Sequence, residues 1–121
     1  LDAEERLEAR LAEGRLRDEL RGADVLNDAV RDAIADARRR GAVVTVFDEG
    51  GMGDVDDSRR EEIRDELAAV LRGAEAERWI IRAASDPQTA VTVVGRARSG
   101  GTSDDDAVDV WHEIPRQKRI P

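Results

Sequence analysis

Apolar residues recur every three or four positions at the start of the chain, which predicts a helix over residues 1–21. Four leucines are spaced to lie near one side of this helix, which Gly14 interrupts; they are Leu7, Leu11, Leu16 and Leu20. The stripe is narrow and flanked by Glu and Arg, as in a helix that packs on a partner helix. We expect either a helix that lies on its own domain or a two-helix contact across a homodimer.

Two further helices are predicted, one from Asp24 to the arginines at 38–40 and one at 58–73. Asp24 is the expected N-cap of the first, and Gly41 its expected left-handed C-terminal residue. Asp57 or Ser58 is the expected cap of the other. Its apolar positions fall within an arc of about 100°, which we expect to pack on a sheet; they are Ile63, Leu67, Val70, Leu71 and Ala74.

Short β-branched and alternating runs predict four strands, at 42–47, 78–84, 90–94 and 107–114. The Asp86-Pro87 step and the short connection favour an antiparallel hairpin between the second and third runs. The last run alternates in polarity, with Val108, Val110, His112 and Ile114 on one side. A basic tail, 116–119, follows it.

The order α-α-β-α-β-β-β indicates an α+β fold, a two-layer sandwich with helices packed on one face of a mostly antiparallel sheet. A chain of 121 residues is expected to form one core. We divide it into an N-terminal helical segment, 1–22, for dimerisation or linkage, and an α+β domain, 23–121.

Acidic residues outnumber basic ones by 28 to 20, so the formal net charge is −8. This field repels phosphates and anionic lipid surfaces, which argues against nucleic acid as a partner and against direct membrane contact. The sequence contains no cysteine, so disulfides and thiolate metal sites are excluded. Because no apolar run approaches the ~20 residues of a membrane span, we expect a cytoplasmic location. The chain begins without Met, within a helical pattern, so we expect it to belong to a longer protein.

Glycines and acids fill the loop at 48–54. The loop lacks the Lys-Ser/Thr ending of a phosphate loop and its acids repel anions, so we interpret it as a flexible connection. Two acidic groups, at 54–57 and 104–106, lack the pattern of a calcium loop and are interpreted as solvated. No metal site is expected. The one histidine, His112, cannot complete a Ser-His-Asp or Cys-His set and is expected to be a packed or edge residue.

The element order and several segments together resemble the ATP-binding domain of bacterial sensor histidine kinases, in the subfamily related to nitrate and cell-envelope stress sensors. The similarity covers about residues 24–114 and rests on a helix ending Asp36-Ala-Arg-Arg-Arg-Gly41, a strand that leads to an Asp, the helix containing Asp65-Glu-Leu-Ala-Ala-Val-Leu-Arg72, and the strands after it. The resemblance implies a homodimeric domain of a two-component sensor protein, with ATP and Mg²⁺ as the family's ligands.

The resemblance also implies where a nucleotide would bind. The family's central helix carries a Glu and an Asn one turn apart and then Arg-His-Ala; here these positions hold Asp65, Ala69 and Arg72-Gly73-Ala74. The family's Asp-x-Gly-x-Gly box, whose Asp holds the adenine amino group, falls on 94–101, where no Asp occurs. The candidate catalytic residue is therefore Asp65, and the candidate nucleotide-binding residues are Arg72, Gly95, Gly100 and Gly101.

Loss of the metal-ligating Asn and the adenine Asp removes ~3–6 kcal/mol of hydrogen bonding, which weakens nucleotide binding by roughly two to four decades. We therefore expect a degenerate histidine kinase-type module that acts in signalling or as a scaffold, without ATP turnover and with no cofactor beyond weakly bound ATP and Mg²⁺. Two alternatives stay open: a functional ATP-binding domain with atypical motifs, and an unrelated small α+β protein-interaction domain. The expected partners are a second copy, held through the N-terminal helices, and a signalling protein.

Overall fold

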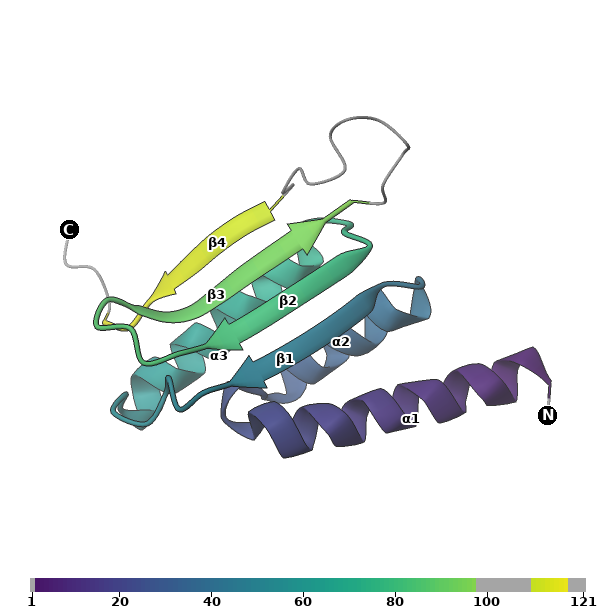
Figure 1. Ribbon diagram of the computed structural model, residues 1–121, viewed down its shortest axis with the longest axis horizontal. Helices are drawn as coiled ribbons and strands as arrows, with labels where there is room; N and C mark the ends of the chain where they lie inside the picture. Colours follow the sequence, from purple (N-terminus) through teal and green to yellow (C-terminus); the bar gives the residue numbers. More distant parts are fainter. Residues whose placement is uncertain (1, 98–109, 118–121) are drawn as a thin grey trace.

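The structure, a computed structural model, describes residues 2–97 and 110–117, which form three helices and a four-stranded sheet (Figure 1). The helices are α1 (Ala3–Gly22), α2 (Asp28–Arg39) and α3 (Asp57–Arg72), with a short 3-10 turn at Ala23–Val25. The strands are β1 (Val43–Asp48), β2 (Arg78–Ala83), β3 (Thr89–Arg96) and β4 (Val110–Pro115). The predicted α+β class and element order are confirmed.

The sheet has the order β1-β2-β3-β4, so neighbouring strands in space are also neighbours along the chain. β1 and β2 are parallel, because the chain returns through α3, whereas β2, β3 and β4 form an antiparallel meander. The predicted hairpin between β2 and β3 is confirmed. Asp86 shapes its turn, since the carboxylate Oδ1 accepts the backbone N–H groups of Gln88 and Thr89 at 2.8 and 2.9 Å.

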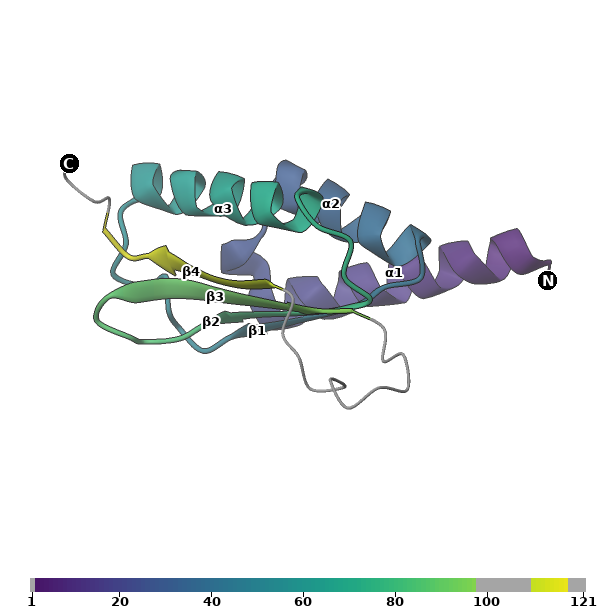
Figure 2. The ribbon, with the colours of Figure 1, turned by 90° about the horizontal axis from the view of Figure 1, so that it is seen from above.

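α2 and α3 cover one face of the sheet, and α1 runs beside the outer edge of β1 (Figures 1 and 2). The core between the two layers is mainly aliphatic, with one fully buried tryptophan, Trp79. The predicted arc of α3 does pack on the sheet: Ile63, Leu67 and Leu71 are buried, Ala68 joins them, and Val70 and Ala74 lie at the border of the core.

Two helix starts differ from the prediction. Asn27, not Asp24, caps α2, and its Oδ1 accepts the N–H of Val30 at 2.9 Å. Asp24 instead lies within the 3-10 turn, and the next two residues, Val25 and Leu26, enter the core. Asp56, rather than Asp57 or Ser58, caps α3 by accepting the N–H of Arg59 at 2.8 Å.

The ends of the remaining elements agree with the sequence within one or two residues. Gly41 has the predicted left-handed conformation, with φ 99°. β4 is described from Val110 onward, and the predicted strand residues 107–109 lie outside the described part of the chain. Within β4, Val110, His112 and Ile114 are the more buried positions, as the alternation predicts.

The prediction that four leucines share one side of α1 is wrong. The helix is continuous, and its inner side holds the buried residues Gly14, Asp18 and Gly22, with Leu7 and Leu11 half-buried. Leu16 and Leu20 face outward and are 63% and 79% exposed. A Cβ at Gly14 would lie 2.8 Å from Nη1 of Arg38, and one at Gly22 would collide with Cγ1 of Val46. Close approach at the two glycines, rather than leucine burial, therefore sets the orientation of α1.

Candidate functional site

Asp65, the candidate catalytic residue, is exposed and contacts the start of α2. The side-chain Nδ2 of Asn27 donates to Oδ1 of Asp65 at 3.1 Å and to Oε1 of Glu61 at 3.0 Å. The same Asn27 side chain caps α2 through its Oδ1, so one amide both starts α2 and joins it to α3. This contact accounts for an acid at position 65 by helix packing alone.

Arg72, a candidate nucleotide-binding residue, ends α3 and also contacts α2. Its Nη1 lies 3.1 Å from Oδ2 of Asp36, and the two side chains are about half exposed. The Asn27 contact at one end and the Arg72 contact at the other fasten α3 to α2. A phosphate at Arg72 would have to displace Asp36 from the guanidinium.

Gly95 is buried in β3, directly across from Trp79 of β2. A Cβ at Gly95 would lie 2.8 Å from Cζ3 of Trp79 and 3.1 Å from Cβ of Ala76. The indole therefore fills the space over this glycine, and packing explains why no side chain is present. The other two candidates, Gly100 and Gly101, lie outside the described residues.

The three described candidates do not form one cluster of polar groups. α3 and β3 both end at the same end of the sheet, which brings Arg72 and Gly95 toward that end (Figure 1). Asp65 lies seven residues earlier on α3, about 10 Å along the helix axis. Asp65 and Arg72, which both contact α2, therefore do not converge with Gly95, which Trp79 covers.

His112 pairs with an acid on α3. Its Nε2 lies 2.7 Å from Oε2 of Glu66, and both side chains are roughly 40% exposed, at 41% and 39%. β4 is an edge strand of the sheet, so the expectation of a packed or edge histidine is confirmed. The pair links the edge strand to the helix above it.

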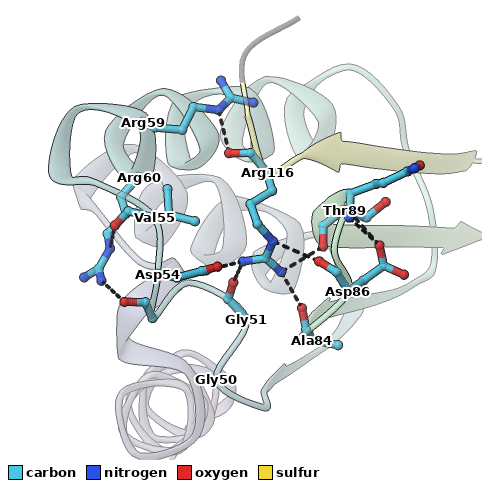
Figure 3. Close-up of polar contacts among 12 residues, drawn as sticks. Gly50, Gly51, Asp54, Val55, Arg59, Arg60, Ala84, Asp86, Thr89 and Arg116 are labelled. Carbon is cyan, nitrogen blue, oxygen red and sulfur yellow. Dashed lines mark hydrogen bonds and ion pairs between the residues drawn. The ribbon is translucent and has the colours of Figure 1, made fainter.

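Arg116 was expected in a basic tail, and that prediction is wrong, because its side chain is buried at the end of β4 (Figure 3). Its guanidinium donates to the carbonyl oxygens of Gly51, Ala84, Asp86 and Thr89, with distances of 3.0, 2.8 and 3.2 Å for the last three. It also donates to Oδ1 of Asp54 at 2.7 Å. The five N–H groups of an arginine are therefore used within the chain.

The acceptors of Arg116 lie in the β1–α3 loop, in the β2–β3 turn and at the first residue of β3, Thr89 (Figure 3). The glycine-rich loop is consequently anchored and is not the flexible connection that its composition predicts: Gly51, Met52 and Val55 are buried. A Cβ at Gly51 would lie 2.5 Å from the backbone N of Ala84, so the loop packs tightly on the end of β2. Arg116 acts as a structural anchor, since the chain itself satisfies its donors.

The acids of this region serve the fold in the same way. Asp54 accepts from Arg116 and Asp56 caps α3. Within the described residues, no group of three or more acidic, histidine or cysteine side chains is arranged to hold a metal ion. The predicted acidic group at 104–106 lies outside the described residues.

The arginines near the end of α2 hold α1 in place. Arg38 donates to both carboxylate oxygens of Asp18, at 2.7 and 2.9 Å, and to the carbonyl of Val44 at 2.9 Å, with both side chains nearly buried. A cavity of about 70 Å³ lies between α1 and α2. At its rim Arg31 donates to Glu19 at 2.6 Å, and this hydrogen bond raises the pKa of Arg31 and lowers that of Glu19. Arg38 thus joins the end of α2 to both α1 and β1.

Comparison of the chain with protein-family models, with curated proteins and with solved structures finds no match in any of the three. The resemblance to sensor histidine kinases therefore stays a prediction. None of the helices in the described part of the chain has the length and apolar character needed to cross a membrane.

Proposed function

We propose that this chain is a noncatalytic module of the sensor histidine kinase type, which acts as a signalling scaffold in the bacterial cytoplasm and self-associates through α1. The observation that carries the proposal is a second apolar stripe on the outer side of α1, opposite the buried side. The stripe consists of exposed residues spaced by three or four positions: Ala9, Ala12, Leu16 and Leu20 of α1 and Ala23 at the start of the 3-10 turn; Ala12 also borders the cavity between α1 and α2. Single exposed leucines are common, but a repeated stripe on a helix is typical of helix–helix contacts.

The outer stripe of α1 is self-complementary when two copies run antiparallel. If Leu16 meets Leu16 of the second copy on a two-fold axis, Leu20 lies beside Ala12 and Ala23 lies beside Ala9. Large side chains then face small ones, as close helix packing requires, and each copy contributes the same surface. On one flank of the stripe Glu13 comes near Arg17 of the other copy, which adds charge complementarity.

The noncatalytic part of the proposal is supported by the partners of the candidate residues. Asp65 is bonded to Asn27, Arg72 to Asp36, and the space over Gly95 is filled by Trp79. A nucleotide site needs polar groups that converge on an open pocket. Here these groups instead connect helices and strands of the same chain.

Sedimentation velocity over roughly 5–500 μM protein tests the scaffold proposal. We expect concentration-dependent dimers for the unaltered chain and monomers for Leu16→Glu/Leu20→Glu, whose changes fall on exposed positions that do not support the core. Ser85→Glu/Gln117→Glu is the matched control, because it adds the same charge at two exposed positions away from α1. A monomer throughout for the unaltered chain, or unchanged dimers in the leucine variant, would contradict the proposal.

The alternative function, a working ATP-binding kinase domain, requires Asp65 and Arg72 to exchange their present partners for nucleotide and Mg²⁺. An unrelated α+β interaction domain would also use α1 as a contact surface. The kinase alternative differs from the proposed function in its affinity for nucleotide, and the interaction-domain alternative differs in its evolutionary origin. The self-association test applies whatever the origin of the chain.

A further inference from the structure

The face of the sheet turned away from α2 and α3 is not covered by any described helix (Figure 2). The strand register aligns Thr45, Ile80, Val94 and Trp111 in one row across all four strands. Because side chains alternate between the two faces of a sheet, this row points away from the core. Trp111 at its end is 64% exposed, and Nε1 of its indole donates to Glu113 on the same face at 3.2 Å.

Arginines lie on both sides of the apolar row. Arg78 and Arg96 are opposite each other on β2 and β3, and Arg82 lies on the other side of the row. Arg82 is already engaged, since its guanidinium lies 5.5 Å from the ring centre of Phe47 and 3.8 Å from Glu49. Within residues 2–97 and 110–117, Arg78 and Arg96 form no ion pair, and Nε of Arg96 is buried there without a hydrogen-bond partner.

This distribution of charge is opposite to that of the whole chain. The chain has a formal net charge of −8, yet among the described residues this face carries three arginines and two acids, Glu113 and, at its border beside Arg82, Glu49. A pair of unneutralised arginines beside an apolar row is complementary to a ligand that is apolar on one side and carboxylate-bearing on its border. Arginine binds carboxylates in a bidentate manner, and arginine and tryptophan are enriched at the centres of protein interfaces.

We propose that this surface binds an acidic, amphipathic peptide segment of a partner protein. We call it the open sheet face and define it by the row Thr45, Ile80, Val94 and Trp111 together with Arg78 and Arg96. The apolar side of the segment lies along the row, and its Asp or Glu side chains pair with the two arginines. The proposal does not depend on self-association, because the open sheet face and the outer stripe of α1 share no residue.

Single-stranded nucleic acid is a less suitable ligand for the open sheet face. Bases are held on sheets by stacking on several aromatic rings. Here only Trp111 offers a largely exposed ring, since Arg82 lies over Phe47, and the middle of the row is aliphatic, at Ile80 and Val94. The net negative charge of the chain also disfavours a polyanion, whose binding depends on many phosphate contacts.

Selection of peptides from a random library displayed on phage, with the full chain as target, tests the proposal. We expect enrichment of sequences that combine Asp or Glu with apolar residues, and roughly tenfold weaker binding of the synthesised consensus peptide to Arg78→Ala/Arg96→Ala. Arg6→Ala/Arg10→Ala makes the same charge change on exposed positions of α1 and is expected to bind as the unaltered chain does. Amide shifts in a ¹⁵N NMR titration should centre on the four-residue row.

Each other outcome overturns the proposal. No enrichment, an enriched consensus without acids, equal binding to both arginine variants, or shifts confined to another surface would show that the open sheet face does not take an acidic segment. Tighter binding of an eight-nucleotide oligouridine than of the consensus peptide would assign the face to nucleic acid instead. Dimers that Arg78→Ala/Arg96→Ala abolishes and Leu16→Glu/Leu20→Glu leaves intact would make a second copy the ligand.

Discussion

Replacing Arg116 with Ala tests how the β1–α3 loop and the β2–β3 turn are held. The substitution removes a buried guanidinium that donates to four carbonyl groups and one carboxylate. Each hydrogen bond to a charged group contributes ~1.5–3 kcal/mol, and a buried acceptor left without a partner costs ~1–3 kcal/mol. Adding these energies over all five acceptors would give a larger loss of stability than single substitutions usually cause. The loss expected for Arg116→Ala therefore depends on which acceptors can bind water instead.

Two of the five acceptors can turn to water when Arg116 is lost. The Asp54 side chain is 75% exposed, and Asp86 lies in an exposed turn. The carbonyls of Gly51, Ala84 and Thr89 lie at buried or half-buried residues and lose their partner. We therefore expect Arg116→Ala to lower the free energy of unfolding by ~3–5 kcal/mol, because three carbonyls that are shielded from water each lose a partner at a cost of ~1–3 kcal/mol.

Urea unfolding followed by far-UV circular dichroism measures the loss, with linear extrapolation to water. Arg116→Lys should recover part of it, because an ammonium group has three donors for the five acceptors. Gln117→Ala, an exposed neighbour, is the control and should change stability by less than ~0.5 kcal/mol. A loss below ~1 kcal/mol for Arg116→Ala would refute the reasoning, because the connections would then hold without the guanidinium.

Three further predictions concern the packing of α1, the space over Gly95 and the response to acid. Asp18→Ala leaves the nearly buried Arg38 without its carboxylate and should cost ~3–5 kcal/mol in urea unfolding, more than the apolar double variant Asp18→Leu/Arg38→Met. Gly95→Ala places a methyl group against Trp79 and should cost ~1–3 kcal/mol, lowering the thermal midpoint; an unchanged midpoint would free Gly95 for another role. The N–H groups of Thr89 and Gln88 hold the pKa of Asp86 below its usual range, so its stabilising contribution is present above the unfolded pKa, about 3.9, and is lost as pH falls through the lower folded pKa. The stability difference between the unaltered chain and Asp86→Ala, measured from about pH 6 to 2, should therefore shrink toward the acid end, and a constant difference would speak against the turn contact.

Local patterns in the sequence were sufficient to predict the helices and strands and their order along the chain. The arc of α3 and the alternation of β4 each report which side of one element meets the core, and both agree with the structure. The prediction from the α1 leucines is wrong because a periodic pattern does not distinguish a stripe that the chain covers from one that it leaves exposed. The glycines at 14 and 22, which look like helix weaknesses, mark the side that approaches Arg38 and Val46.

Arg116 shows a limit that no local pattern overcomes. Its acceptors stand between 27 and 65 residues earlier in the chain, so its burial depends on how β4 meets two distant connections. In the sequence it is one of several bases after Pro115 and looks solvated. Arg78 of the open sheet face, by contrast, had a readable signal: together with Ile80 and Arg82 it alternates with the buried residues of β2.

The candidate site was predicted from similar positions in a family, and its residues have contacts that similarity alone does not reveal. Asp65 was placed correctly on a helix, but its amide partner comes from α2 and became visible only with the packing of the two helices. Gly95 was a candidate nucleotide-binding residue, whereas the structure shows that Trp79 fills the space over it.

Isothermal titration of the full chain with ATP and with a nonhydrolysable analogue, in the presence of Mg²⁺, tests the central claim of a noncatalytic module most directly. Because Asp65 and Arg72 are held by α2 and Trp79 covers Gly95, we expect no binding heat up to about millimolar ligand. Binding with a dissociation constant below ~100 μM, and weaker binding by Asp65→Ala or Arg72→Ala, would contradict the account and establish a nucleotide site on α3.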